Sequence, residues 1–226
     1  MIAISIALAM SQNVATTPAH RLGEEWWKQR HEHCVEVTKK GGVDVAFLGD
    51  SITQGWEGEG KAMWDQHLAP LKSANFGFSG DRTEHVLWRL DNGELLGLKP
   101  KLIVIMIGTN NIGHGSSNAS ATSEGVKAIV GKLRKNIPAA KILLLGIFPR
   151  GADLNDPGRR ACAEATKGFQ ALHDGKSVFC EDVGHHFLNR DGTMRQRLMP
   201  DLLHPNRSGY EIWTKAMMPI VSNLLK

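Results

Sequence analysis

The stretch Leu102-Ile103-Val104-Ile105-Met106-Ile107 consists of six consecutive apolar residues and ends at Gly108. It lacks the alternation of apolar and polar residues that marks a strand with one face in water. Such a run predicts a strand buried on both faces, which is typical of a parallel sheet covered by helices on each side. Four further runs of strand length are found at residues 43–48, 73–76, 142–147 and 177–181.

Segments of helical periodicity alternate with these runs, at residues 22–39, 63–67, 83–90, 123–136, 157–173 and 208–224. In the last segment, apolar residues recur at spacings of three and four: Trp213, Met217, Ile220, Val221 and Leu224. Ser208 with Glu211 predicts a capping box at its start. The alternation predicts an α/β fold, a three-layer α/β/α sandwich with a doubly wound, five-stranded parallel sheet.

The composition, with 42% hydrophobic and 22% charged residues, is that of an ordinary globular protein. A chain of 226 residues buries roughly 70% of the surface that its unfolded form exposes, and so needs no disulfides or structural metal. No linker rich in Pro, Gly or Ser divides the chain. We therefore expect a single domain over residues 21–226.

The first 20 residues contain an apolar run from Ile2 to Met10. This run is shorter than the ~20 residues that cross a bilayer, so no transmembrane segment is expected. It fits the h-region of a secretory signal, with Ala7-Leu8-Ala9 as a cleavage site, or an N-terminal arm packed on the body. We expect residues 1–20 to be a signal remnant or such an arm. A signal over residues 1–9 favours export to the periplasm or medium, and an arm favours the cytoplasm.

Several partner classes are disfavoured. Lys and Arg exceed Asp and Glu by only 27 to 23, and no basic stretch is interleaved with aromatic residues, which argues against nucleic acid. Cys34, Cys162 and Cys180 are too few and too scattered for a disulfide framework or a zinc site, and are expected to be buried small residues. His31 and His33, whose spacings do not bring them together with Cys34 as metal ligands, are expected on a solvated or half-buried helix surface. We expect neither a metal nor an organic cofactor.

Polar residues follow the predicted strands, at the edge where ligands bind in open α/β sheets. Ser51 comes directly after the run at 43–48. A serine hydroxyl becomes a nucleophile only beside a base that a third group holds in one tautomer. Asp201 and His204, three residues apart before the last helix, supply both roles and predict a catalytic triad. Thr53 breaks the G-x-S-x-G pattern of the α/β-hydrolase elbow, which disfavours that class.

Acyl transfer also needs donors that face the oxygen on which negative charge develops. Gly80 lacks a Cβ, so its backbone N–H can approach a substrate closely. Asp81 beside it is a candidate N-cap, with Glu84 three residues later. The Ser51 N–H and the Asn110 side-chain amide complete a predicted oxyanion hole of three donors.

These residues form ordered blocks: Gly49-Asp50-Ser51, Gly80, Gly108-Thr109-Asn110 and Asp201-Leu202-Leu203-His204. The blocks resemble those of the SGNH, or GDSL-type, esterases and lipases. Residues 75–95, with His85-Val86-Leu87-Trp88-Arg89-Leu90 inside them, are similar to the catalytic subunit of intracellular platelet-activating-factor acetylhydrolase and its bacterial esterase relatives. The resemblance runs from about residue 43 to the C-terminus, and it implies a flavodoxin-like SGNH hydrolase domain. It also implies Ser51 as nucleophile, His204 as base, Asp201 as its orienter, and Ser51, Gly80 and Asn110 as the oxyanion hole.

The sequence therefore predicts a serine esterase that hydrolyses short-chain esters, acetyl esters foremost, through an acyl-enzyme. Ile52 and Leu203, beside the nucleophile and the base, are expected to wall a short acyl pocket, and Trp56 is expected to overhang the site. The alcohol half stays open between an acetylated sugar, an acetyl phospholipid and a generic short-chain ester. The alternatives are an acyltransferase and a non-catalytic carbohydrate- or protein-binding module on the same fold. A homodimer is a further expectation.

Overall fold

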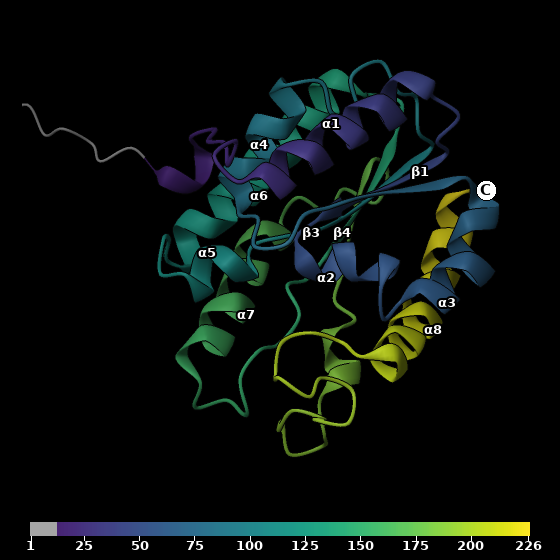
Figure 1. Ribbon diagram of the computed structural model, residues 1–226. Coiled ribbons are helices and arrows are strands. Elements are labelled where there is room, and N and C mark those ends of the chain that lie inside the picture. The colour runs from purple at the N-terminus through teal and green to yellow at the C-terminus, as the bar shows by residue number, and fades with distance from the viewer. Residues whose placement is uncertain (1–12) are drawn as a thin grey trace, which may run out of the picture.

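The computed structural model describes residues 13–226, and the expectations for residues 1–12 lie outside this range. Five parallel strands form one sheet in the order β2-β1-β3-β4-β5, with helices on both faces (Figure 1). The strands are β1 (Val45–Gly49), β2 (Ser73–Gly77), β3 (Leu102–Met106), β4 (Lys141–Leu145) and β5 (Val178–Glu181). The predicted three-layer α/β sandwich with a doubly wound, five-stranded parallel sheet is confirmed.

The strand β1 lies between β2 and β3, and this order determines which loops meet at the edge of the sheet. Gly49, the last residue of β1, pairs with Gly77 of β2 on one side and with Met106 of β3 on the other. All residues of β1 and β3 are buried, as their unbroken apolar runs predict. The loops that leave these three strands therefore start side by side.

Four helices cover one face of the sheet: α1 (Glu25–Lys40), α4 (Thr83–Asp91), α6 (Ala119–Asn136) and α7 (Pro157–Gln170). The other face is covered by α8 (Arg207–Leu224), by η5 (Gly184–Phe187) and by short helical turns between β1 and β2. Each face has its own hydrophobic core, the first under α1, α4, α6 and α7 and the second under α8.

Trp56 belongs to the second core. Its ring centroid lies 4.7 Å from that of Tyr210 and 4.7 Å from that of Trp213, and its side chain is fully buried. The expectation that Trp56 overhangs the site is wrong, because the turn that carries it folds inward against α8 rather than outward over the strand ends.

The residues predicted as a helix, 63–67, are helical and lie within a continuous stretch over 61–71 that changes from α to π to 3-10 geometry, in a region of short helical elements between β1 and β2. These elements are α2 (Ser51–Gln54), η2 (Gly55–Glu57), α3 (Lys61–Met63), η3 (Trp64–Leu68) and η4 (Ala69–Leu71). Pro70 in η4 cannot donate a backbone hydrogen bond and Lys72 turns left-handed with φ of 52°, so a longer helix ends here.

Two long helices start earlier than predicted. Asn206 caps α8, its side chain accepting the Gly209 N–H at 3.1 Å, so Ser208 lies inside the first turn and the predicted capping box is wrong. Asn118 caps α6 in the same way, so that this helix begins four residues before position 123. Both asparagines have an extended backbone and a short side chain that reaches the free N–H groups of the first turn.

Residues 13–24, here called the N-terminal strap, lie across α4 and α6 and include η1 (Val14–Thr16) (Figure 1). The Asn13 side chain donates to the Ala121 carbonyl at 3.2 Å, and the Thr83 hydroxyl donates to the Ala15 carbonyl at 2.8 Å. The described part of the expected N-terminal arm therefore packs on the body of the protein.

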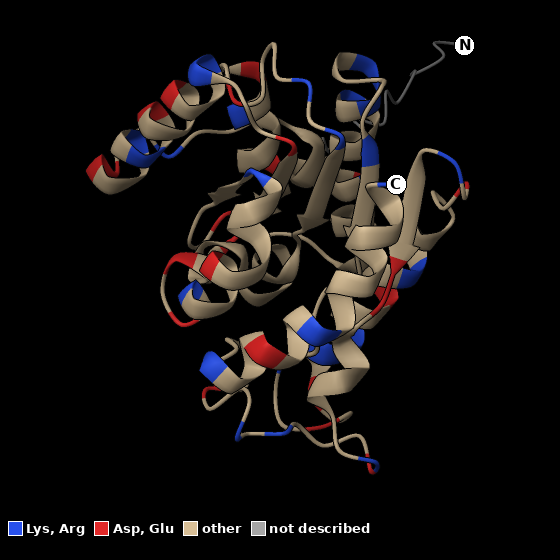
Figure 2. Ribbon diagram, turned by 90° about the vertical axis from the view of Figure 1, so that its right-hand side faces the viewer, with Lys and Arg blue, Asp and Glu red and all other residues tan. Residues whose placement is uncertain are grey.

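Charged residues lie on the helices and loops, with both signs interspersed, and in the sheet only Lys141 and Glu181 carry charge (Figure 2). Among residues 13–226, every helix is too short or too polar to cross a membrane.

Candidate active site

Ser51 is the first residue of α2, and one residue, Asp50, separates it from the end of β1. Asp50 caps this short helix, its carboxylate accepting the Ile52 N–H at 3.0 Å. Burial raises the pKa of the Asp50 carboxyl to about 7. Gly49 allows the close approach of β1 and β3, because a Cβ there would lie 2.5 Å from the Met106 carbonyl oxygen. The backbone therefore holds Ser51 at the edge of the sheet.

The structure brings Ser51, His204 and Asp201 together, although Ser51 and His204 are 153 positions apart. The Ser51 hydroxyl oxygen lies 2.9 Å from His204 Nε2, and His204 Nδ1 lies 2.7 Å from Asp201 Oδ2. The other Asp201 oxygen accepts the backbone N–H groups of Leu203 and His204, at 3.0 and 2.7 Å. Leu202 between them turns left-handed, with φ of 64°. This tight turn orients the Asp201 carboxylate toward the imidazole ring.

Electrostatics fix the direction of the relay. Partial burial acts to raise the pKa of Asp201, but hydrogen bonds from the His204 ring and from the backbone outweigh it and lower that pKa below its ordinary value. An ionised carboxylate accepts hydrogen bonds only, so Nδ1 of His204 carries the proton shared with Asp201. Nε2 is then the nitrogen that accepts the Ser51 hydroxyl proton.

Gly80 and Asn110 lie in the loops that follow β2 and β3, the two strands flanking β1. Gly80 is the third residue of a turn closed by the Asp81 N–H and the Phe78 carbonyl at 3.1 Å, and its φ of +72° suits only glycine there. Asn110, in α5 (Thr109–Gly113), donates from its side chain to the Asp81 carbonyl at 3.0 Å. One residue, Asp81, thus links the loops of two expected oxyanion donors.

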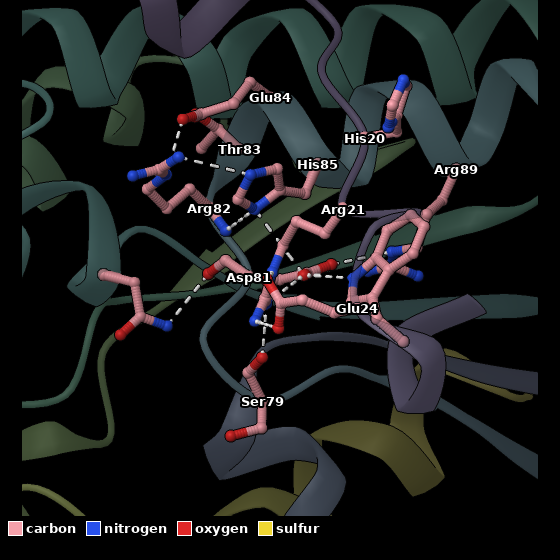
Figure 3. A network of polar contacts seen from close by, with 12 residues as sticks. His20, Arg21, Glu24, Ser79, Asp81, Arg82, Thr83, Glu84, His85 and Arg89 are labelled. Carbon is pink, nitrogen blue, oxygen red and sulfur yellow. Dashed lines mark hydrogen bonds and ion pairs between the residues drawn. The ribbon is translucent and has the colours of Figure 1, made fainter. Parts of the chain in front are cut away.

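Asp81 is not the N-cap of α4, so that expectation is wrong. Arg82 occupies the cap position, and its backbone N–H donates to His85 Nδ1 at 3.0 Å. Burial, aided by the charge of Arg82, lowers the pKa of His85 to about 3, so the neutral ring can accept this bond. The Asp81 carboxylate points into the protein instead, toward partners on other elements (Figure 3).

Ile52 and Leu203, the residues expected to form the acyl pocket, both contact the second core. Ile52 is buried, and its carbonyl accepts the Tyr210 hydroxyl at 2.7 Å. Leu203 is half-buried and packs against the same core. Their role as walls of an acyl pocket stays a prediction.

The remaining histidines and cysteines singled out in the sequence have structural places. His31 is buried, and its ring stacks on Trp27 with centroids 5.7 Å apart, so the expected solvated or half-buried surface is wrong there, whereas His33 is exposed. Cys34 is buried, as expected of the cysteines. Cys162 is buried as expected, whereas Cys180 is half-buried. Within residues 13–226, His, Cys, Asp and Glu side chains form no group of three or more placed to hold a metal ion.

Sequence reasoning missed the buried ions beside Gly80. Asp81, Arg89 and Glu94 are fully or almost fully buried, and Arg89 bridges the two carboxylates. The available signal was an arginine inside the apolar segment that includes Val86 and Leu90, since a charge on the packed face of a helix must find a buried partner.

Comparison with known proteins shows the family of the chain. The family model for the GDSL-like lipase/acylhydrolase family matches residues 47–212. The chain is 36% identical over 206 residues to the platelet-activating factor acetylhydrolase IB subunit alpha1 of Bos taurus, covering 90% of this chain and 85% of the relative. It is 36% identical over 205 residues to the subunit alpha2 of Gallus gallus, covering 90% and 87%.

Solved structures share the fold at low sequence identity. A GDSL-like lipase from Bacteroides thetaiotaomicron has a TM-score of 0.68 at 16% identity, covering 87% of this chain and 97% of that chain. Axe2, an acetylxylan esterase from Geobacillus stearothermophilus, has a TM-score of 0.63 at 18% identity, covering 79% and 94%.

The α/β sheet, the polar residues at its carboxyl edge and these relatives define a carboxylic ester hydrolase. The chain belongs to the GDSL-like lipase/acylhydrolase family, which confirms the resemblance drawn from its sequence blocks.

Proposed function

We propose that the protein hydrolyses short-chain carboxylic esters, acetyl esters foremost, through an acyl-enzyme on Ser51. The observation that carries the proposal is the unbroken relay from the Ser51 hydroxyl through His204 to Asp201, with heavy-atom distances of 2.9 and 2.7 Å. These distances are those of a nucleophile, a general base and the group that orients the base.

The reaction follows from the relay. The Ser51 oxygen bonds to the ester carbonyl carbon while its proton passes to His204 Nε2, and the carbonyl oxygen takes the electron pair of the broken π bond. On collapse, the bond to the alcohol oxygen breaks and that oxygen receives the proton from Nε2. Water then repeats both steps on the acyl-enzyme and releases the acid. Asp201 stabilises the imidazolium in each cycle without taking its proton.

Three neutral hydrogen-bond donors stabilise the negative charge that develops on the carbonyl oxygen. They are the backbone N–H groups of Ser51 and Gly80 and the side-chain amide of Asn110. Asn110 has two amide hydrogens, of which the Asp81 carbonyl accepts one. The other is available to the oxyanion. A fixed, neutral donor stabilises this charge without a change of protonation.

The acyl group is proposed to be small because Ile52 and Leu203 lie beside the nucleophile and the base, and the curated relatives are named acetylhydrolases. The alcohol half is not defined by these contacts. A panel from acetyl to octanoyl esters, followed by acetylated sugars and acetyl phospholipids, would establish both halves. Turnover that peaks at octanoyl esters would contradict the acetyl assignment.

Hydrolysis is proposed over acyl transfer because the curated relatives are named acetylhydrolases. The side chains of His204 and Asp201 are 43% and 56% exposed, so bulk water reaches the atom that activates the second nucleophile. Product analysis with a competing alcohol separates the two activities. A product that is mainly the new ester would favour the acyltransferase.

Replacing Ser51 by Ala tests the proposal, with Ser222→Ala, an exposed serine near the end of α8, as the control. We expect Ser51→Ala to lose turnover of a chromogenic acetyl ester and Ser222→Ala to keep it. Retained turnover in Ser51→Ala would move the nucleophile elsewhere. A wild-type protein that turns over no ester and ignores a serine-reactive phosphonate would instead support a non-catalytic binding module.

A further inference from the structure

Asp81 is a fully buried carboxylate that belongs to neither the nucleophile nor its base. Its Oδ1 accepts hydrogen bonds from Arg21 at 3.0 Å and from the Trp27 indole at 2.8 Å, and its Oδ2 accepts one from Arg89 at 2.9 Å. These donors come from the N-terminal strap, α1 and α4 (Figure 3). Three separate parts of the chain therefore fix the position of one residue.

The backbone of Asp81 touches both loops of the expected oxyanion hole. Its N–H closes the turn that holds Gly80 in a left-handed conformation, and its carbonyl accepts one hydrogen of the Asn110 amide at 3.0 Å. With that hydrogen engaged, the amide plane cannot rotate freely. The second hydrogen is thereby aimed in one direction.

We propose that Asp81 is the positioning residue of the oxyanion hole, because its clamped carboxylate fixes the Gly80 turn and its carbonyl orients the Asn110 amide. This inference rests on the proposed function of Gly80 and Asn110. Asp81 does not touch the substrate; it acts through the two donors.

The buried charges around Asp81 are balanced, as a buried site requires: Arg89 and the largely buried Arg21 face Asp81 and Glu94, and Glu24 is exposed. Arg89 also pairs with Glu94, and its guanidinium carbon lies 3.9 Å from the centroid of the Phe78 ring. Arg21 also pairs with Glu24. Two guanidinium groups and three carboxylates thus hold one another in fixed orientations. Burying a network of ion pairs costs free energy of desolvation, so the network contributes little to the stability of the fold. Its fixed orientations suit it to position neighbouring groups.

Arg21 lies at the solvent-exposed edge of this network, so it can be substituted without replacing a fully buried residue. Its side chain is 17% exposed, and Nη1 donates both to the Ser79 carbonyl, at 2.7 Å, and to Asp81. These two contacts bracket Gly80, where a Cβ would lie 3.2 Å from the same nitrogen. A change at Arg21 loosens the turn and leaves the buried Arg89 pairs in place.

The test uses Asp81→Asn and Arg21→Gln in the full-length protein, assayed with a chromogenic acetyl ester. We expect kcat to fall about 100-fold and about tenfold, with KM within about twofold, since misaligned donors lose transition-state contacts only. The fraction of reactive Ser51, counted by phosphonate titration, corrects for misfolded protein.

Arg134→Gln is the matched control. Arg134 is also half-buried and donates to two carbonyls, those of Pro138 and Ala140, at the opposite end of the sheet. The kcat of Arg134→Gln is expected to stay at the wild-type value.

A combination with Asn110→Ala distinguishes positioning from general loosening. If Asp81 acts partly through Asn110, Asp81→Asn costs only about tenfold in the Asn110→Ala background, because coupled groups are not additive. Full multiplication of the two effects, or an unchanged kcat in Asp81→Asn, would overturn the inference. If Asp81→Asn does not fold, Arg21→Gln by itself decides, and a kcat at the wild-type value would overturn the inference. Turnover that persists in Ser51→Ala would instead refute the proposed function itself.

Discussion

The relay half of the site (Ser51, Asp201, His204) and the oxyanion half (Gly80, Asp81, Asn110) differ in burial and in the range of their contacts. The Asp201–His204 pair spans three positions, and its side chains are about half exposed. In the oxyanion half, Asp81 is fully buried and Asn110 is 6% exposed, and the contacts of Asp81 with Asn110, Trp27 and Arg21 span 29, 54 and 60 positions. Within the relay half, Asp201 and His204 form a local turn in water, although Ser51 lies 153 positions from His204. The oxyanion half is buried and is held by several distant segments.

The difference follows from what each half has to do. A relay that passes a proton to a leaving alcohol and then accepts one from water works at a surface that both can reach. Donors that stabilise a transient negative charge are worth most when they are fixed before the reaction and shielded from water. The residues that position the oxyanion donors are therefore buried and fixed, whereas the base is exposed to solvent. The following predictions test this comparison, from the largest effect to the smallest.

Replacing His204 by Ala breaks the relay half without disturbing the fold. We expect kcat to fall by about 10⁴-fold or more. The free energy of unfolding is expected to change by less than about 1 kcal/mol, because the His204–Asp201 pair is exposed and local. Steady-state kinetics and denaturant unfolding measure the two effects. A large loss of stability would show that the relay half is also a structural element, contrary to the comparison.

Replacing Asn110 by Ala should reduce kcat less than His204→Ala does, and stability more. We expect kcat to fall by about 10² to 10³, as when one oxyanion donor is lost. Stability should fall by about 1–2 kcal/mol, because the buried Asp81 carbonyl loses its hydrogen bond. The same two assays apply. An unchanged kcat would remove Asn110 from the oxyanion hole, whatever its effect on stability.

Replacing Asp50, which precedes Ser51, should have a smaller effect, namely a change in how the stability of the protein depends on pH. The folded pKa of Asp50, about 7, lies above the ordinary value of 3.8, because burial disfavours the charged form. The folded state therefore binds its proton more tightly, and stability falls as pH rises from about 4 to 7. Asp50→Asn keeps the helix cap but removes this dependence.

The measurement for Asp50 is Tm at pH 4.5 and at pH 7.5, in wild type, in Asp50→Asn and in a control, Asp65→Asn. Asp65 is exposed and pairs only with Lys61. We expect the wild-type difference in Tm between the two pH values to shift in Asp50→Asn alone, toward relative stabilisation at the higher pH. No shift in Asp50→Asn would mean that Asp50 is ionised in the folded protein across this range.

The strands and the relay half were accessible from the sequence because their signals are local. The run Leu102 to Ile107 is apolar throughout, and all five predicted strands match the structure within two residues. Ser51 follows such a run, and Asp201 lies three residues before His204, a spacing that one turn brings together. Residue order and strand ends were enough to bring these side chains to one edge.

The oxyanion half depends on contacts that no local pattern encodes. Nothing in the segment around Asp81 indicates that Arg21, 60 positions earlier, reaches it from the strap. For the same reason Trp56 was placed over the site, although the distant residues Tyr210 and Trp213 enclose it in the second core. Helix starts were missed where one good cap, Asn206, competed with another nearby, Ser208.

Peptide mass spectrometry after reaction with a serine-reactive phosphonate tests the central claim most directly. The account predicts one adduct per chain, on Ser51, formed rapidly in the wild-type protein and far more slowly when His204 is replaced by Ala. An adduct on another serine, or equal rates of labelling in the two proteins, would contradict it.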